Sequence, residues 1–141
     1  MRTILTFICT IVLLSACETA NTDPLLLQVN GQWKLIKIGI GFPAPGGPTE
    51  IQPTYQETLE FDASNGNFTR IKDGKVVEQT KVSVSSDKKA TYNRDMLIFE
   101  KSNTYSYISF TETSKYMVLY QSAPVGSTLA DGNSFFYEKI K

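Results

Sequence analysis

The chain has 141 residues, the length of a single domain, and its 14 basic and 14 acidic residues leave a formal net charge of zero. This balance, without any run of like charges, argues against nucleic-acid binding. The sequence contains no histidine and only two cysteines, Cys9 and Cys17. The usual general base near neutral pH, the Ser-His-Asp and Cys-His catalytic arrangements and the commonest metal ligand are therefore missing. We expect neither an enzyme nor a bound metal or other cofactor.

The first 16 residues have the features of a bacterial signal peptide. Arg2 provides a positive charge, and residues 4–14 form an 11-residue, mostly apolar stretch. This stretch has the length of a signal-peptide core and is too short to span a bilayer, which takes about 20 apolar residues. Small residues follow, and Leu14-Ser15-Ala16-Cys17 resembles the bacterial lipobox. The alternative is an ordinary secretory signal followed by a chance cysteine.

The lipobox resemblance implies cleavage before Cys17 and acylation of that cysteine, so that the acyl chains hold the protein on a membrane. Glu18 follows, where an aspartate would be similar to the inner-membrane retention signal of enteric bacteria. We therefore expect an outer-membrane lipoprotein of the bacterial cell envelope, on either the periplasmic or the outer surface of that membrane. Residues 17–28 are expected to comprise the acylated cysteine and a polar tether.

The remaining sequence, residues 29–141, has the pattern of one all-β domain. Turn signals recur about every ten residues, which is typical of a sandwich or barrel of short strands. Two loops, 41–54 and 121–133, are rich in proline and glycine, and the first is expected to carry no strand pairing. Asp73-Gly74 is a strong two-residue hairpin signal. We expect eight strands, over residues 33–40, 55–62, 68–72, 75–84, 96–100, 104–111, 115–120 and 134–141.

Alternation along these strands predicts which side chains share a face. In the first strand Trp33, Leu35 and Lys37 fall on the same face. The hairpin formed by the sixth and seventh strands is expected to pair Phe110 with Lys115. This register puts four tyrosines on one face, either as an exposed stacking surface or as ordinary cross-strand packing: Tyr105, Tyr107, Tyr116 and Tyr120.

At the head of the first strand, Gly31-Gln32-Trp33 resembles the Gly-x-Trp signature of lipocalins. In that family the tryptophan plugs the closed end of an eight-stranded barrel and a late basic residue packs across it, a role that the resemblance assigns to Lys139. The resemblance implies an eight-stranded antiparallel barrel, with a strongly bent β-sandwich as the alternative. A similar spacing occurs in short lipocalin-like lipoproteins of Bacteroidota, on Trp33, Leu59-Glu60-Phe61, Phe68, Asp131-Gly132-Asn133-Ser134 and Tyr137.

One carboxylate falls on a face that is otherwise apolar. Glu57 lies between Tyr55 and Leu59, and an inward glutamate costs free energy unless it is paired or wet. Glu78 repeats the pattern in its own strand, and Arg70 is a candidate countercharge. We therefore hypothesise a ligand site beneath the 41–54 loop, with Tyr55, Glu57 and Arg70 as its polar contacts. The alternative is that Glu57 and Arg70 pair with each other at the barrel rim.

An eight-stranded barrel either is filled by its own side chains or holds one small ligand. Two functions follow from these two cases. In the first, a monomeric, membrane-anchored barrel binds a small apolar or amphipathic molecule. In the second, a solid barrel acts as a structural, inhibitory or protein-interaction module with no small-molecule ligand. The volume of the interior separates them, since a ligand pocket has a volume of about 300 Å³ or more.

Overall fold

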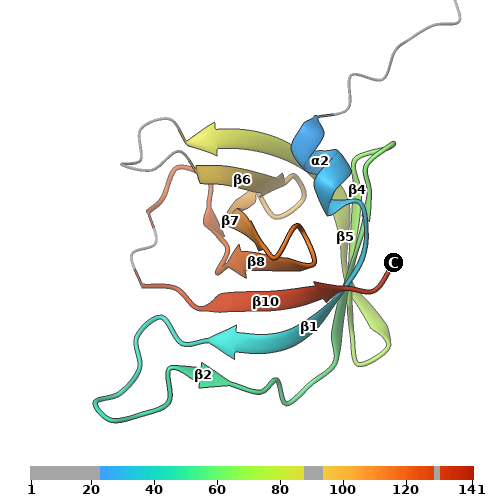
Figure 1. The fold of residues 1–141 in the computed structure, drawn as a ribbon. Coiled ribbons are helices and arrows are strands. Elements are labelled where there is room, and N and C mark those ends of the chain that lie inside the picture. Colours follow the sequence, from blue (N-terminus) through green and yellow to red (C-terminus); the bar gives the residue numbers. More distant parts are fainter. Residues whose placement is uncertain (1–22, 88–93, 129–130) are drawn as a thin grey trace, which may run out of the picture.

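A computed structural model of the chain describes residues 23–87, 94–128 and 131–141. Eight antiparallel strands pair in sequence, and the last also pairs with the first, which closes the sheet into a barrel (Figure 1). All eight strands expected from the sequence are confirmed, and this closure rules out the bent sandwich. The strands are β1 (Gly31–Gly39), β3 (Glu57–Asp62), β4 (Asn67–Lys72), β5 (Lys75–Asp87), β6 (Arg94–Phe99), β7 (Thr104–Thr111), β8 (Tyr116–Tyr120) and β10 (Ser134–Lys139).

The two long loops carry more pairing than expected. In the first, β2 (Glu50–Ile51) pairs with the end of β1, and in the second, β9 (Ala123–Pro124) pairs with the start of β7. The expectation that the 41–54 loop forms no ladder was therefore wrong. Both strands are only two residues long and lie at an edge, where a proline such as Pro124 removes no hydrogen bond from the interior of a ladder.

A β-bulge in β1 changes which of its residues face the interior. Leu35 pairs with Tyr137 of β10, whereas Lys37 pairs with the adjacent Phe136, so that Ile36 is the extra residue. Beyond the bulge the inward position passes to Ile38, which is buried. The expectation that Lys37 shares the face of Trp33 and Leu35 was therefore wrong, and the Lys37 ammonium instead forms an ion pair with Glu50 of β2 at 2.8 Å.

The β7–β8 hairpin has a register two residues away from the expected one. Phe110 pairs with Met117 and not with Lys115. Three consecutive turn residues, Glu112, Thr113 and Ser114, have positive φ angles of 50°, 55° and 70°. Because side chains alternate with a period of two, this shift leaves every residue on its expected face.

Trp33 closes one end of the barrel. Its side chain is fully buried, and its Nε1–H donates a hydrogen bond of 2.6 Å to the carbonyl oxygen of Val29. The Nζ of Lys139 lies 5.1 Å from the centroid of the indole ring, which is the arrangement that the resemblance implies. Gly31 has a φ of +114°, and a Cβ atom there would lie 2.1 Å from the carbonyl oxygen of Lys141. Only glycine fits that position.

A short helix, α2 (Pro24–Val29), covers this closed end. The Asp23 carboxylate caps it by accepting a hydrogen bond of 2.8 Å from the backbone N–H of Leu25, and Pro24 occupies the first turn. Val29 is fully buried, and Leu25 and Leu26 pack against the core. The assignment of residues 24–28 to a polar tether was therefore wrong, because six residues are too few to show helical periodicity in the sequence.

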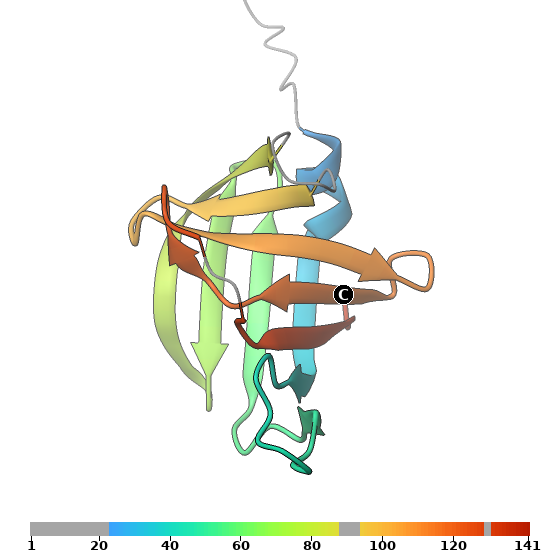
Figure 2. The same ribbon diagram turned by 90° about the vertical axis from the view of Figure 1, so that its left-hand side faces the viewer.

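The hydrophobic core begins at the closed end with Trp33 and continues to Leu119 and Tyr137 towards the end bounded by the loops. Figure 2 shows α2 at the top of the barrel and the 41–54 loop at the opposite end, with β1 running between them. None of the described residues forms a helix long and apolar enough to span a membrane. The largest fully buried side chains of the core include Trp33, Leu59, Phe68, Leu97, Phe99, Met117 and Tyr137.

Trp33→Ala should lower the free energy of unfolding by about 3–5 kcal/mol, because it removes the largest side chain of the closed end and leaves a cavity. Trp33→Phe keeps an aromatic ring but loses the hydrogen bond to Val29, so its loss should be smaller. Chemical denaturation of the chain from Glu18 onward measures both values. A loss below about 1 kcal/mol for the alanine variant would contradict this account of the closed end.

Candidate functional site

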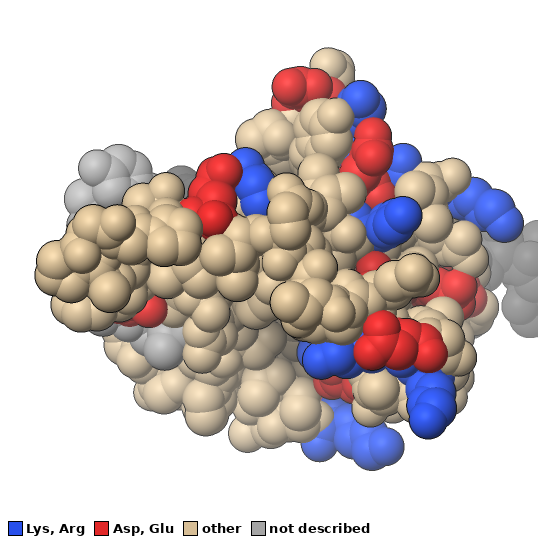
Figure 3. All heavy atoms as spheres, turned by 90° about the horizontal axis from the view of Figure 1, so that it is seen from below, with Lys and Arg blue, Asp and Glu red and all other residues tan. Residues whose placement is uncertain are grey.

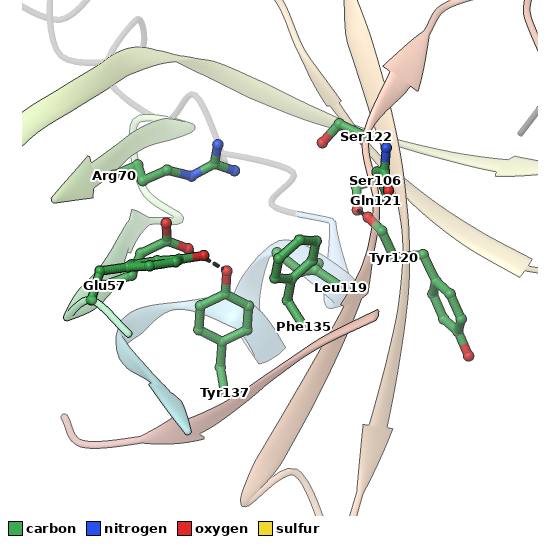
Figure 4. A pocket seen from close by; sticks show the side chains of 10 residues that line it. Glu57, Arg70, Ser106, Leu119, Tyr120, Gln121, Ser122, Phe135 and Tyr137 are labelled. Carbon is green, nitrogen blue, oxygen red and sulfur yellow. Dashed lines mark hydrogen bonds between the residues drawn. The ribbon is translucent and has the colours of Figure 1, made fainter. Parts of the chain in front are cut away.

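A pocket of about 290 Å³ opens into the barrel at the end opposite α2. All three residues nominated from the sequence, Tyr55, Glu57 and Arg70, line it. Figure 4 shows Glu57, Arg70 and Tyr137 on one side of the pocket and Ser106, Gln121 and Ser122 on the other. Leu119 and Phe135 add apolar surface to the lining. The pocket therefore has an apolar area between two polar walls, one formed by Glu57, Arg70 and Tyr137 and the other by Ser106, Gln121 and Ser122.

Glu57 is held inside the barrel at the start of β3. The residue is only 8% exposed, and one of its carboxylate oxygens accepts a hydrogen bond of 2.6 Å from the hydroxyl of Tyr137. The β4–β5 turn fixes the chain just before it: the backbone N–H of Gln56 donates to the Asp73 carboxylate at 2.9 Å, and the N–H of Asp73 donates to the Gln56 carbonyl at 2.9 Å. Asp73 and Gly74 have positive φ angles of 49° and 76°, as a type I′ hairpin requires.

The two tyrosine hydroxyls of the pocket keep their protons well above neutral pH. Burial raises the pKa of Tyr137 well above its usual value, and the negative charge of Glu57 and its hydrogen bond add to the effect. Burial and the charge of Glu57 also raise the pKa of Tyr55. Both phenols are therefore neutral hydrogen-bond donors beside a carboxylate.

Arg70 projects from β4 into the same pocket but does not pair with Glu57. Its Nη1 lies 3.2 Å from a carboxylate oxygen of Glu78, the residue directly opposite on β5. A bulge at Val77 brings the two opposite each other, because Arg70 pairs with Glu78 while the next residue, Ile71, already pairs with Val76. The rim pair between Glu57 and Arg70 that the sequence left open is not formed. The Nε of Arg70 is buried and has no hydrogen-bond partner among the described residues.

The opposite wall contains polar residues that the sequence did not single out. Ser106 is 1% exposed, and its hydroxyl donates a hydrogen bond to the carbonyl oxygen of Tyr120. Gln121 is fixed by Asn133, whose backbone N–H donates to the Gln121 side chain at 3.1 Å. Ser106 lies on the inward face of β7 with Ile108, which is buried in the core. The criterion that identified Glu57, a polar residue on an apolar face, would have identified Ser106 as well.

The tyrosines of the β7–β8 hairpin lie on the outer face of the barrel. The Tyr105 hydroxyl donates to the carbonyl oxygen of Ser127 at 2.9 Å, and the rings of Tyr105 and Tyr107 meet edge to face at 5.3 Å. The guanidinium of Arg94 lies 5.5 Å and 5.9 Å from the ring centroids of Tyr107 and Tyr120. Figure 4 shows the Tyr120 ring turned away from the pocket. Neighbouring side chains and the 121–133 loop therefore cover these tyrosines, as in ordinary packing on a sheet face.

The face seen in Figure 3 carries no large patch of purely basic or purely acidic side chains. Basic and acidic side chains alternate there, and neither sign forms a continuous patch. Within residues 23–87, 94–128 and 131–141, no group of three or more acidic, cysteine or histidine side chains is placed to hold a metal ion. The proposed lipid attachment at Cys17 lies outside the described residues.

Comparison of the chain with protein-family profiles, with curated protein sequences and with solved structures gave no match. The fold itself is a closed, eight-stranded, all-antiparallel β-barrel that is compatible with a lipocalin-like fold. The function is therefore inferred from the fold and from the residues that line the pocket.

Tyr137→Phe should change how stability depends on pH. Because the folded pKa of Tyr137 is raised, its contribution to stability is fully present below pH 10 and is lost as the pH rises beyond that value. The wild-type free energy of unfolding should therefore fall above pH 10, and the variant should show a slope shallower by up to about 1.4 kcal/mol per pH unit. Equal slopes in the wild-type protein and the variant would contradict the assignment.

Proposed function

We propose that this protein binds a small amphipathic molecule in the pocket at the open end of its barrel. The observation that carries the proposal is the pocket itself: about 290 Å³ of space on the inner side of the sheet, at the lower limit of volumes typical of ligand sites. The apolar part of the ligand would pack against Leu119 and Phe135. Its polar part would contact Glu57, Arg70 and Tyr137.

The distribution of side chains inside the barrel favours this function over that of a solid interaction module. Large apolar residues fill the core, whereas the open end also contains a buried carboxylate and a guanidinium. A barrel that acts only through its outer surface gains nothing from charged groups in its interior, which cost free energy when they are desolvated. A binding site, in contrast, uses a few placed polar groups within an otherwise apolar pocket.

We also propose that acyl chains on Cys17 anchor the protein in the outer membrane of a bacterial cell envelope. Cys17 precedes α2 by seven residues, which span at most about 25 Å when extended. The anchor would therefore hold the α2 end of the barrel near the membrane. The pocket, at the opposite end, would face away from that membrane and take its ligand from the aqueous side (Figure 2).

Native mass spectrometry of the protein, extracted gently from its own membrane, should reveal a stoichiometric small-molecule adduct in addition to the acyl chains. Glu57→Gln and Arg70→Gln should reduce adduct occupancy more than they reduce the free energy of unfolding, because both side chains face the pocket. The control is Glu50→Gln, which removes an equal charge from an exposed ion pair with Lys37. Absence of any adduct from the wild-type protein would contradict a ligand-binding role. Equal losses of occupancy and stability would identify structural residues instead.

Cys17→Ser should abolish membrane association and leave an uncleaved or soluble species, because the acyl chains have no other attachment point in the lipobox. Metabolic labelling with a radioactive fatty acid and detergent phase partition test this outcome. A variant that still carries the lipid label, or still enters the detergent phase, would show that the anchor is wrongly assigned.

A further inference from the structure

Two opposite charges line one pocket of this barrel without neutralising each other. The carboxylate of Glu57 and the guanidinium of Arg70 both face it, yet they form no ion pair within 4 Å. Each is held by another residue, since Glu57 accepts from Tyr137 and Arg70 pairs with Glu78. These two partners, Tyr137 and Glu78, keep the Glu57 carboxylate and the Arg70 guanidinium apart. They do so although the low dielectric of a protein interior strengthens the attraction between the two charges.

The neighbouring cation does not neutralise Glu57 either. Lys72 lies directly opposite Glu57 in the β3–β4 ladder. Its ammonium lies 3.7 Å from the centroid of the Tyr55 ring and forms no ion pair with Glu57. The Tyr137 hydroxyl is thus the one hydrogen-bond donor to the Glu57 side chain among the described residues.

Both charged groups retain unused hydrogen-bonding capacity. A carboxylate can accept about four hydrogen bonds, and Glu57 accepts one. A guanidinium has five N–H donors, and within the described residues Arg70 forms one ion pair and leaves its Nε without a partner. A ligand that supplies the missing partners stabilises the buried Glu57 carboxylate and the half-buried Arg70 guanidinium, whose Nε is buried.

We infer that the ligand has a dipolar head, with an ammonium group that contacts Glu57 and a carboxylate group that contacts Arg70. This inference rests on the proposed function and specifies the chemistry of its ligand. The apolar part of the molecule lies against Leu119 and Phe135 on the same pocket surface. A pocket of about 290 Å³ lies at the lower limit of ligand-site volumes, which favours a small molecule of amino-acid size.

A ligand with a single charge fits this arrangement less well. A simple carboxylic acid would pair with Arg70 but would place its negative charge in the same pocket as Glu57. A simple amine would pair with Glu57 but would approach Arg70. The two tyrosine hydroxyls remain protonated, because burial and the charge of Glu57 raise the pKa of each, so they add no further negative charge. Only a head group with both charges satisfies both walls.

Three probes, none of them larger than phenylalanine, separate these cases without any mutation. Phenylalanine carries both charges, 3-phenylpropanoate retains only the carboxylate, and phenylalanine amide retains only the ammonium. Isothermal titration calorimetry with the detergent-solubilised full chain, at slightly acidic pH so that the amide stays protonated, should show phenylalanine binding at least about tenfold more tightly than either relative. This is the size of effect that one lost charged hydrogen bond produces. Equal or tighter binding of either singly charged probe would overturn the inference.

The two pocket variants assign each charge to its residue. Glu57→Gln should reduce the affinity for phenylalanine, because the ammonium loses its partner. It should not weaken the binding of 3-phenylpropanoate, because it removes the negative charge that opposes a carboxylate. Arg70→Gln should reduce the affinity for phenylalanine, because the carboxylate loses its partner. It should not weaken the binding of phenylalanine amide, which has no carboxylate. Glu50→Gln, in the exposed ion pair with Lys37, should leave all three affinities unchanged. If a pocket variant does not fold, the comparison of probes on the wild-type protein still decides the question.

The native adduct distinguishes failure of this inference from failure of the proposed function. A native adduct that carries one charge or none, with no binding of phenylalanine, would overturn the dipolar head and leave a ligand-binding barrel. Absence of both an adduct and probe binding would overturn the two proposals together. Displacement of the native adduct by phenylalanine, but not by its two relatives, would support both.

Discussion

Closure of the sheet at Trp33 is the constraint on which the rest of this structure depends. Trp33 lies on β1, the strand that pairs with β3 on one side and β10 on the other, opposite Leu59 and Lys139. Its indole ring is fully buried and hydrogen-bonded to the backbone of Val29, which ties α2 to the same point. Burial of this size contributes several kcal/mol, a large part of the net stability of a small domain. The opposite end combines core side chains such as Leu119 and Tyr137 with polar groups that line the pocket.

The open end of the barrel holds polar side chains, among them Glu57 and Arg70, on the inner side of the sheet. Two β-bulges, at Ile36 and Val77, adjust the walls, one by turning Lys37 outwards and the other by bringing Glu78 opposite Arg70. The charges then remain separate because each has its own partner across a strand. The indole of Trp33 closes one end of the barrel, and the proposed ligand recognition belongs to the other end.

The sequence predicted the strands and much of the pocket for a physical reason. Alternation and turn residues are local signals, so all eight strands were recognisable, and a glutamate among apolar neighbours marked Glu57 as inward. Other features depend on tertiary contacts. The six-residue helix α2 is too short to show periodicity, and the two-residue register shift at Phe110 alters no face. Arg70 was recognisable as a countercharge, but its choice of Glu78 over Glu57 depends on a bulge that has no local sequence signal.

A crystal structure of the protein purified from its own membrane, without denaturation, tests the central claim most directly. The claim is that the open end is a preorganised ligand site in which Glu57 and Arg70 each retain hydrogen-bonding capacity for a ligand. We predict electron density for a small molecule between Glu57 and Arg70, with Tyr137 still bonded to Glu57. A collapsed pocket in which Glu57 and Arg70 form a direct ion pair, with no bound molecule, would contradict it.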